Sequence, residues 1–163
     1  SFKIEGRMKT ALYVATVART YRKAIDDYKK DPALYQKNME WYKAEIGKCT
    51  YREFTTGFYF GKPTTDSQIY DSNTYVKNYT YLGTVEEVRE DGCCRIEQKN
   101  KFSVGEQIEI MKPDGRNVLV TVKGITDEDG NAMESAPHPK QILWVDLGSE
   151  VSPYDILRRS EME

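Results

Sequence analysis

Charged side chains occupy alternate positions near the amino end of the chain: Lys3, Glu5, Arg7 and Lys9. Residues 2–5 alternate between apolar and polar side chains, which predicts a short strand. Gly6 follows this strand and allows the chain to turn sharply. If this strand belongs to a parallel α/β barrel, its carboxyl end is where such barrels carry functional side chains. The four residues are therefore candidates for contacting an anion or a substrate. The alternative is that they form solvated ion pairs at the start of a helix.

Three consecutive aromatic residues, Phe58, Tyr59 and Phe60, lie between Gly57 and Gly61. Aromatic rings beside a basic segment can stack on nucleobases. We favour the alternative of a structural clasp, in which the glycines form turns and the rings fill a core. The Gly-x-x-x-Gly spacing does not match a phosphate-binding loop, which ends in Gly-Lys-Ser/Thr.

Nucleophiles and metal ligands are few. The one histidine, His138, lies between two prolines without a neighbouring serine or cysteine, so we expect it to have a structural or loop role and assign no catalytic residue. The cysteines Cys49, Cys93 and Cys94 lack Cys-x-x-Cys spacing, and vicinal cysteines in a strand point to opposite faces. We therefore predict neither a disulfide framework nor a metal site, and expect either Cys93 or Cys94 to face the core.

Two kinds of periodicity divide the chain into a helical half and a strand-rich half. Apolar residues at helical spacing predict a helix over residues 10–29, and Asp31-Pro32 predicts the start of a second helix that ends at Gly47. Alternation and glycine-marked turns then predict a small, mainly antiparallel β-barrel, so the fold class is α+β. The expected strands are 81–89, 94–98, 107–111, 118–125 and 142–147, with a terminal helical turn from Ser152-Pro153 to Arg158-Arg159.

The length of 163 residues favours one domain, or one domain with a substantial appendage. Residues 1–62 carry 13 basic and 7 acidic side chains, whereas residues 63–163 carry 11 and 19. We therefore expect a helical segment over 1–62, a loop over 63–78 and the barrel over 79–163. The barrel half, with a charge of −8, lacks the electrostatic footprint of a nucleic-acid-binding domain, which only the helical half could supply.

No apolar run is long enough for a membrane helix and no signal peptide is recognisable, so we expect a cytoplasmic protein without membrane contact. The chain begins with Ser1 inside a strand-like stretch, which suggests a piece of a longer protein. Removal of a covering domain would expose Val14, Val17 and Tyr21, and we expect a homodimer through these helices.

Five stretches carry a family resemblance: FKIEGRMK (2–9), YVATV (13–17), TTGFYFG (55–61), EQKNKFSVGE (97–106) and APHPKQ (136–141). Together they resemble the carboxyl-terminal part of the collagenase-like peptidase family U32. The resemblance implies a longer protein in which an α/β barrel with a cysteine-ligated iron–sulfur cluster precedes a small β-barrel. Residues 2–9 then resemble the last strand of that α/β barrel, and residues 10–47 the helices after it. The three cysteines do not match the cluster pattern, so no cofactor is expected in this chain.

Two classes of activity are implied by the resemblance. Some family members are assigned as peptidases or collagenases, and others act in the hydroxylation of uridine or cytidine in tRNA or ribosomal RNA, or of quinone rings. Our main hypothesis is an accessory module that positions a macromolecular substrate for a collagenase-like peptidase and is not catalytic alone. The alternative is a module that binds or positions RNA in a tRNA hydroxylation enzyme. In either case the partners are the upstream barrel domain and a protein or RNA substrate.

Overall fold

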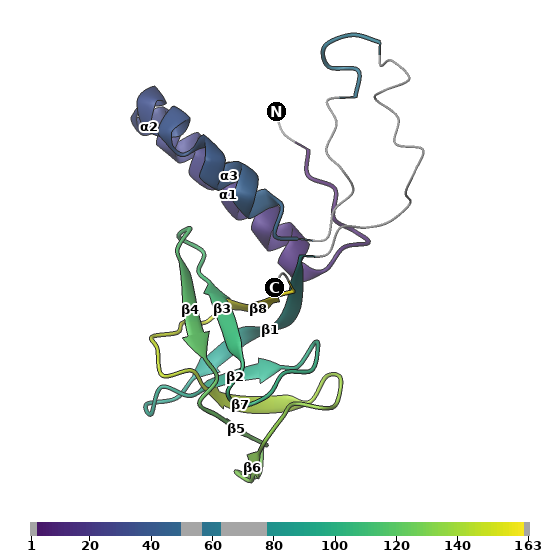
Figure 1. Ribbon diagram of the computed structural model, residues 1–163, viewed down its shortest axis with the longest axis vertical. Helices are drawn as coiled ribbons and strands as arrows, with labels where there is room; N and C mark the ends of the chain where they lie inside the picture. The colour runs from purple at the N-terminus through teal and green to yellow at the C-terminus, as the bar shows by residue number, and fades with distance from the viewer. Residues whose placement is uncertain (1–2, 50–56, 63–77, 162–163) are drawn as a thin grey trace.

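The computed structural model describes residues 3–49, 57–62 and 78–161, to which every structural statement below refers. A hairpin of helices lies against one side of a curled β-sheet (Figure 1). The helical hairpin extends beyond the edge of the sheet (Figure 1). In this part of the chain, no helix is both long and apolar enough to cross a membrane.

The first helix, α1 (Ala11–Lys30), has a hydrogen-bonded cap at its amino end. The Thr10 hydroxyl accepts a hydrogen bond from the backbone N–H of Tyr13 at 3.3 Å. At the other end, the Asp31 carboxylate accepts one from the N–H of Ala33 at 2.9 Å and so caps α2 (Pro32–Lys37). The predicted first helix and the boundary at Asp31-Pro32 are confirmed.

The second predicted helix is interrupted. It consists of α2 and α3 (Met39–Ile46), separated at Asn38. The Asn38 amide donates a hydrogen bond to Asp27 of α1 at 2.9 Å, and the Tyr42 hydroxyl donates to the same carboxylate oxygen at 2.6 Å. These contacts between helices fix the break, and they depend on residues distant in sequence.

The strand expected at residues 2–5 is not formed by residues 3–5, which have no regular structure. A strand requires a hydrogen-bonded neighbour, and none of the strands in the described ranges pairs with this segment. The charged residues around Gly6 therefore lie on a loop that leads into α1.

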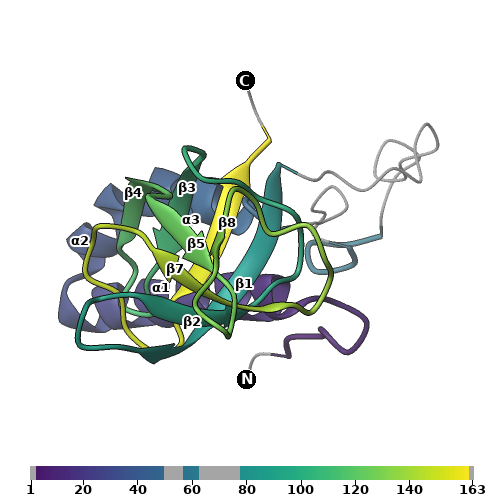
Figure 2. The same cartoon turned by 90° about the horizontal axis from the view of Figure 1, so that it is seen from below.

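The sheet has eight strands in the order β4-β3-β8-β1-β2-β7-β5-β6, and all neighbouring pairs are antiparallel. The strands are β1 (Tyr79–Val88), β2 (Cys94–Glu97), β3 (Gln107–Met111), β4 (Asn117–Thr121), β5 (Gly124–Thr126), β6 (Ala132–Met133), β7 (Ile142–Asp146) and β8 (Ile156–Ser160). Between β4 and β5, the Val122 N–H donates to the Glu106 carbonyl at 2.9 Å and the Lys123 N–H to the Asp146 carbonyl at 2.8 Å. Residues 122–123 thus pass directly from β4, at one end of the strand order, to β5, next to the other end, so the sheet curls into a half-barrel (Figure 2).

The predicted terminal helical turn is wrong, because residues 156–160 form the central strand β8. This strand pairs with β1 on one side and β3 on the other. Its Leu157 is fully buried in the core, while Arg158 is also fully buried but faces the helices. A strand buried on both faces lacks the apolar–polar alternation by which half-exposed strands are recognised. The two-residue strand β6 was also not predicted.

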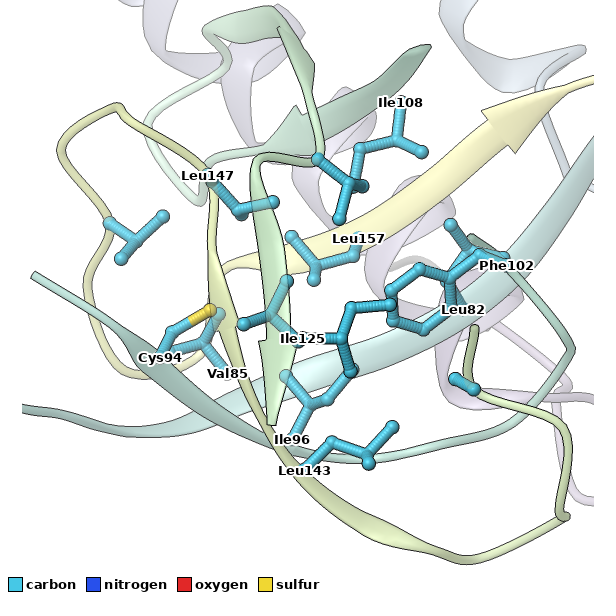
Figure 3. Packing of buried hydrophobic residues seen from close by; sticks show 14 of the residues in the cluster. Leu82, Val85, Cys94, Ile96, Phe102, Ile108, Ile125, Leu143, Leu147 and Leu157 are labelled. Carbon is cyan, nitrogen blue, oxygen red and sulfur yellow. The ribbon is translucent and has the colours of Figure 1, made fainter. Parts of the chain in front are cut away.

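A single apolar cluster fills the concave side of the curled sheet (Figure 3). Cys94 belongs to it and is fully buried, whereas the neighbouring Cys93 is half-buried. Gly83 of β1 allows a close approach, because a Cβ atom there would lie 3.2 Å from the Glu97 carbonyl oxygen. A smaller cluster on the outside joins Leu12 of α1 to Met111 of β3 and Ile156 of β8. The helical hairpin thus packs on the outer side of the sheet at β3 and β8.

Candidate functional site

A buried ionic cluster joins the helical hairpin to the sheet. Its centre is Glu45 of α3, whose side chain is 1% exposed. Glu45 forms ion pairs with Arg158 of β8 at 2.6 Å and with Arg19 of α1, and it accepts a hydrogen bond from the Asn117 amide at 2.8 Å. Lys48 lies 3.2 Å from its second carboxylate oxygen. Burial opposes ionisation, but the charges of Arg158 and Arg19 hold the pKa of Glu45 below its usual value.

The two buried arginines of this cluster have further partners. Arg158 donates from Nε to Glu109 at 2.6 Å. Arg19 donates from Nη1 to the Lys112 carbonyl oxygen at 2.8 Å and to the Asn117 side chain at 3.0 Å. Because the charged side chains of this cluster are already paired with one another, they are not available to bind a substrate. The cluster instead holds α1 and α3 on the sheet. The cluster was not predicted, because the sequence carries only a weak signal of it, the carboxylate of Glu45 beside the apolar Ile46.

The structure partly brings together the predicted substrate-binding residues. Lys3 and Glu5 line a surface groove of about 210 Å³ together with Tyr13, Tyr21 and Ile46. Arg7 and Lys9 do not line it. Burial, the neighbouring Cys49 and Tyr21, and the Glu5 carboxylate raise the pKa of Tyr13.

Contacts with the following residues hold the loop that carries these charges in place. The Glu5 carboxylate accepts a hydrogen bond from the backbone N–H of Arg7 at 3.0 Å, and Lys9 Nζ lies 5.4 Å from the Tyr13 ring centre. A Cβ atom on Gly6 would lie 2.6 Å from Val14 Cγ2, so the glycine lets the loop approach α1. The role of the four charged residues as substrate contacts stays a prediction.

The groove continues along the hairpin into a second hollow of about 350 Å³, which shares Tyr21 and Ile46 with the first. Tyr21 is 44% exposed and Val14 is 41% exposed, as expected for an uncovered helical face. The expectation that Val17 is also uncovered is wrong, because this side chain is only 7% exposed. Homodimerisation through this face stays a prediction.

The three consecutive aromatic rings are exposed. Phe58, Tyr59 and Phe60 are 78%, 84% and 81% exposed, and the rings of the last two meet edge to face with their centres 5.0 Å apart. The prediction that these rings fill a core is therefore wrong. The glycines do form turns, with φ angles of +52° at Gly57 and +133° at Gly61. The segment lies away from both the sheet and the helices, at the top of Figure 1.

The three thiols have environments that oppose thiolate formation. Burial raises the pKa of Cys49 to about 11 and that of Cys94 to about 12, and burial also raises the pKa of Cys93. An iron–sulfur cluster is usually held by four Cys thiolates, whereas this chain has three cysteines, so these residues do not fit the cluster that the family resemblance implies for the longer protein. Among the residues described here, no three His, Cys, Asp or Glu side chains are grouped to hold a metal ion. His138 is exposed in a turn.

Two family profiles match the chain. Residues 77–158 match the profile of the peptidase family U32 C-terminal domain, and residues 1–69 match the profile of peptidase family U32. The chain belongs to peptidase family U32. The family predicted from the five sequence stretches is thereby confirmed.

Relatives of this U32 chain carry two kinds of name. The chain is 36% identical to tRNA hydroxylation protein P1 of Bacillus subtilis and 31% identical to tRNA hydroxylation protein P of Escherichia coli, each over 162 residues. These alignments cover 99% and 98% of this chain but only 38% and 35% of the relatives. An uncharacterised protease of Methanocaldococcus jannaschii is 48% identical over 60 residues, which are 37% of this chain and 14% of that protein.

One solved structure is the C-terminal domain of a Geobacillus thermoleovorans protein assigned to the U32 peptidases. It is 30% identical to this U32 chain and has a TM-score of 0.46. The match covers 49% of this chain and 99% of that domain.

Proposed function

We propose that this chain is the noncatalytic carboxyl-terminal part of a tRNA hydroxylation protein, in which it binds and positions the RNA substrate. The observation that carries the proposal is the name shared by the two relatives that match nearly the whole chain. The reactive centre, with the iron–sulfur cluster implied by the family, would then lie in the part of the longer protein outside this chain. Such a role is consistent with the expected cytoplasmic location.

The distribution of charge supports an RNA-binding role for the helical half. Residues 1–62 have a net charge of +6, and Lys3 and Arg7 are exposed on the loop before α1. Most basic side chains of the sheet form ion pairs with carboxylates: Arg95, Lys99, Lys112, Arg116, Arg158 and Arg159. In the helical half, five basic side chains are paired in the same way: Arg19, Arg22, Lys23, Lys43 and Lys48. Phosphates are recognised mainly by available Lys and Arg side chains, so RNA would contact the helical half.

The remainder of the longer protein would dock on the outer face of the helical hairpin. This face carries the hollow of about 350 Å³ and the exposed apolar side chains of Val14 and Tyr21. Exposed apolar patches of this kind mark interaction surfaces. In our proposal the upstream α/β barrel covers the patch and so places its reactive centre beside the RNA held by this chain.

A second candidate function is the positioning of a peptide for a peptidase. It is favoured by the short but close match to the uncharacterised protease of M. jannaschii. The relatives that match over the full chain favour RNA instead. Cleavage of casein or gelatin by the 163-residue chain, abolished by His138→Ala, would contradict both proposals because it requires a reactive centre within the chain.

The proposed function is tested by binding of fluorescently labelled tRNA to the 163-residue chain at several salt concentrations. We expect log K to fall linearly with log salt concentration, because bound phosphates release counterions. Lys3→Gln and Arg7→Gln should each reduce the slope by about 1. Lys123→Gln, which removes an exposed lysine next to β5 of the sheet, is the matched control and should leave the slope unchanged. An absence of binding at about 50 mM salt, or binding insensitive to salt, would refute the proposal.

A further inference from the structure

We propose that the segment Gly57–Lys62, named here the aromatic tip, is a stacking site for unpaired nucleobases. The inference deepens the proposed RNA-binding function and rests on it. The tip presents Phe58, Tyr59 and Phe60 to solvent, each at least 78% exposed. Three adjacent exposed aromatic rings are unusual for a protein surface, since they lose the hydrophobic stabilisation that burial would give.

The backbone of the aromatic tip holds the rings outward. The Gly61 N–H donates a hydrogen bond to the Phe58 carbonyl at 3.2 Å, which closes a turn between the two glycines. Both glycines have positive φ angles, and a Cβ atom at either would meet nothing within 4 Å. Because the three rings are at least 78% exposed, a base could approach them without displacing other described parts of the chain.

The chemistry of the tip favours a nucleobase as its occupant. Every base has a π-face, and stacking on aromatic side chains requires no particular sequence. Lys62 follows the rings after Gly61 and is exposed, so a cation is available for the phosphate beside a stacked base. The segment also belongs to the half of the chain with a net charge of +6. Sequence-specific recognition of RNA commonly uses unpaired loop bases stacked on aromatic rings, and duplex RNA does not present such faces.

The test uses the 163-residue chain with a single-stranded RNA of about 12 nucleotides carrying the fluorescent base 2-aminopurine, and with an RNA duplex as comparison. Tyr59→Leu keeps an apolar side chain but removes the aromatic face, whereas Tyr59→Trp keeps the face. Tyr154→Leu is the matched control, since Tyr154 is 79% exposed but precedes β8 on the sheet. Stacking quenches the fluorescence of 2-aminopurine, which reports on ring contact independently of affinity.

We expect Tyr59→Leu to weaken binding of the single strand by roughly 5- to 150-fold and to abolish the quenching. Tyr59→Trp should retain both, while duplex binding and the Tyr154→Leu variant should be unchanged. Each variant should keep the thermal unfolding midpoint of the parent chain, since the substituted rings are exposed.

The outcomes separate the two proposals. If the parent chain binds tRNA with the expected salt dependence but Tyr59→Leu binds and quenches equally well, the stacking site is refuted and the proposed function stands. If the parent chain binds no RNA, both fail. A third outcome would assign the tip to a protein interface and overturn the inference. In this outcome the Tyr59→Leu variant and the parent chain bind RNA equally well, and both also bind the separately expressed upstream domain.

Discussion

Replacement of Glu45 by glutamine tests whether the buried ionic cluster holds the helical hairpin on the sheet. The parent carboxylate faces Arg158 at 2.6 Å, Lys48 at 3.2 Å and the Asn117 amide at 2.8 Å, in addition to Arg19. Glutamine keeps one acceptor oxygen but turns an N–H₂ group toward donors. It also leaves Glu109 as the only carboxylate beside these three cations in the described cluster.

Removal of one partner from a buried ion pair costs about 3 to 5 kcal/mol. We expect the lower end, about 3 kcal/mol, because Glu109 remains and Lys48 is 21% exposed. For a chain of this length, this corresponds to a fall in melting temperature of about 6 to 12 °C. Glu40→Gln makes the same chemical change on the same helix, at a side chain that is 87% exposed and paired with Lys43, and should cost less than about 0.5 kcal/mol.

Two tryptophans allow the unfolding of the hairpin and the sheet to be followed separately. Trp41 belongs to α3 and Trp144 to β7. Denaturant titrations of single-tryptophan variants, made with Trp41→Phe or Trp144→Phe, would give one transition for each element. With Glu45→Gln, we expect the Trp41 transition to move to lower denaturant than the Trp144 transition. Equal costs for Glu45→Gln and Glu40→Gln would refute the reasoning.

Three further predictions follow from the same structure. The lowered pKa of Glu45 stabilises the fold at pH values above the ordinary glutamate pKa of about 4.3, and this contribution is lost as the pH falls through the pKa of the folded state. Acid titration of Glu45→Gln, followed by circular dichroism, should therefore show a smaller loss of stability with falling pH than the parent chain. A curve identical to that of the parent chain would contradict this. Cys94 is fully buried, and burial raises its pKa to about 12, so it should react with a thiol reagent only after unfolding. Rapid labelling of Cys94 in the native chain, detected by peptide mass spectrometry, would be inconsistent with its burial. Light scattering should show dimers at high concentration through the face containing Val14 and Tyr21, and Tyr21→Glu should shift the chain to monomer; a parent chain that stays monomeric would disprove this interface.

Local patterns were sufficient wherever a short-range interaction determines the structure. The helix boundary at Asp31-Pro32 depends on a cap that reaches only to Ala33. The glycine-marked turns expected between strands are likewise local, and positive φ angles are found at Gly92, Gly105, Gly115 and Gly130. The break at Asn38 could not be predicted in this way, because it depends on hydrogen bonds to Asp27 in another helix.

The candidate site shows the same division. The charged loop and the aromatic run were both identified from residue types, but their environments were not. The rings of Phe58 and Phe60 were expected inside a core and are exposed, because a run of aromatic residues does not reveal whether another element lies over it. The exposure of the aromatic tip is the observation on which the stacking proposal depends.

The sequence by itself determined the family, the helical character of the first half, the antiparallel strands of the second and the unequal charge of the two halves, since each is expressed in residues near one another along the chain. Only the tertiary structure decided that Arg158 lies in a central strand and meets Glu45 across 113 positions of sequence. The buried charge of Arg158 is compensated by Glu45 and Glu109, and no local pattern identifies partners so distant. The packing of the helices on the sheet therefore decided which charged side chains form ion pairs within the fold and which remain available to a substrate.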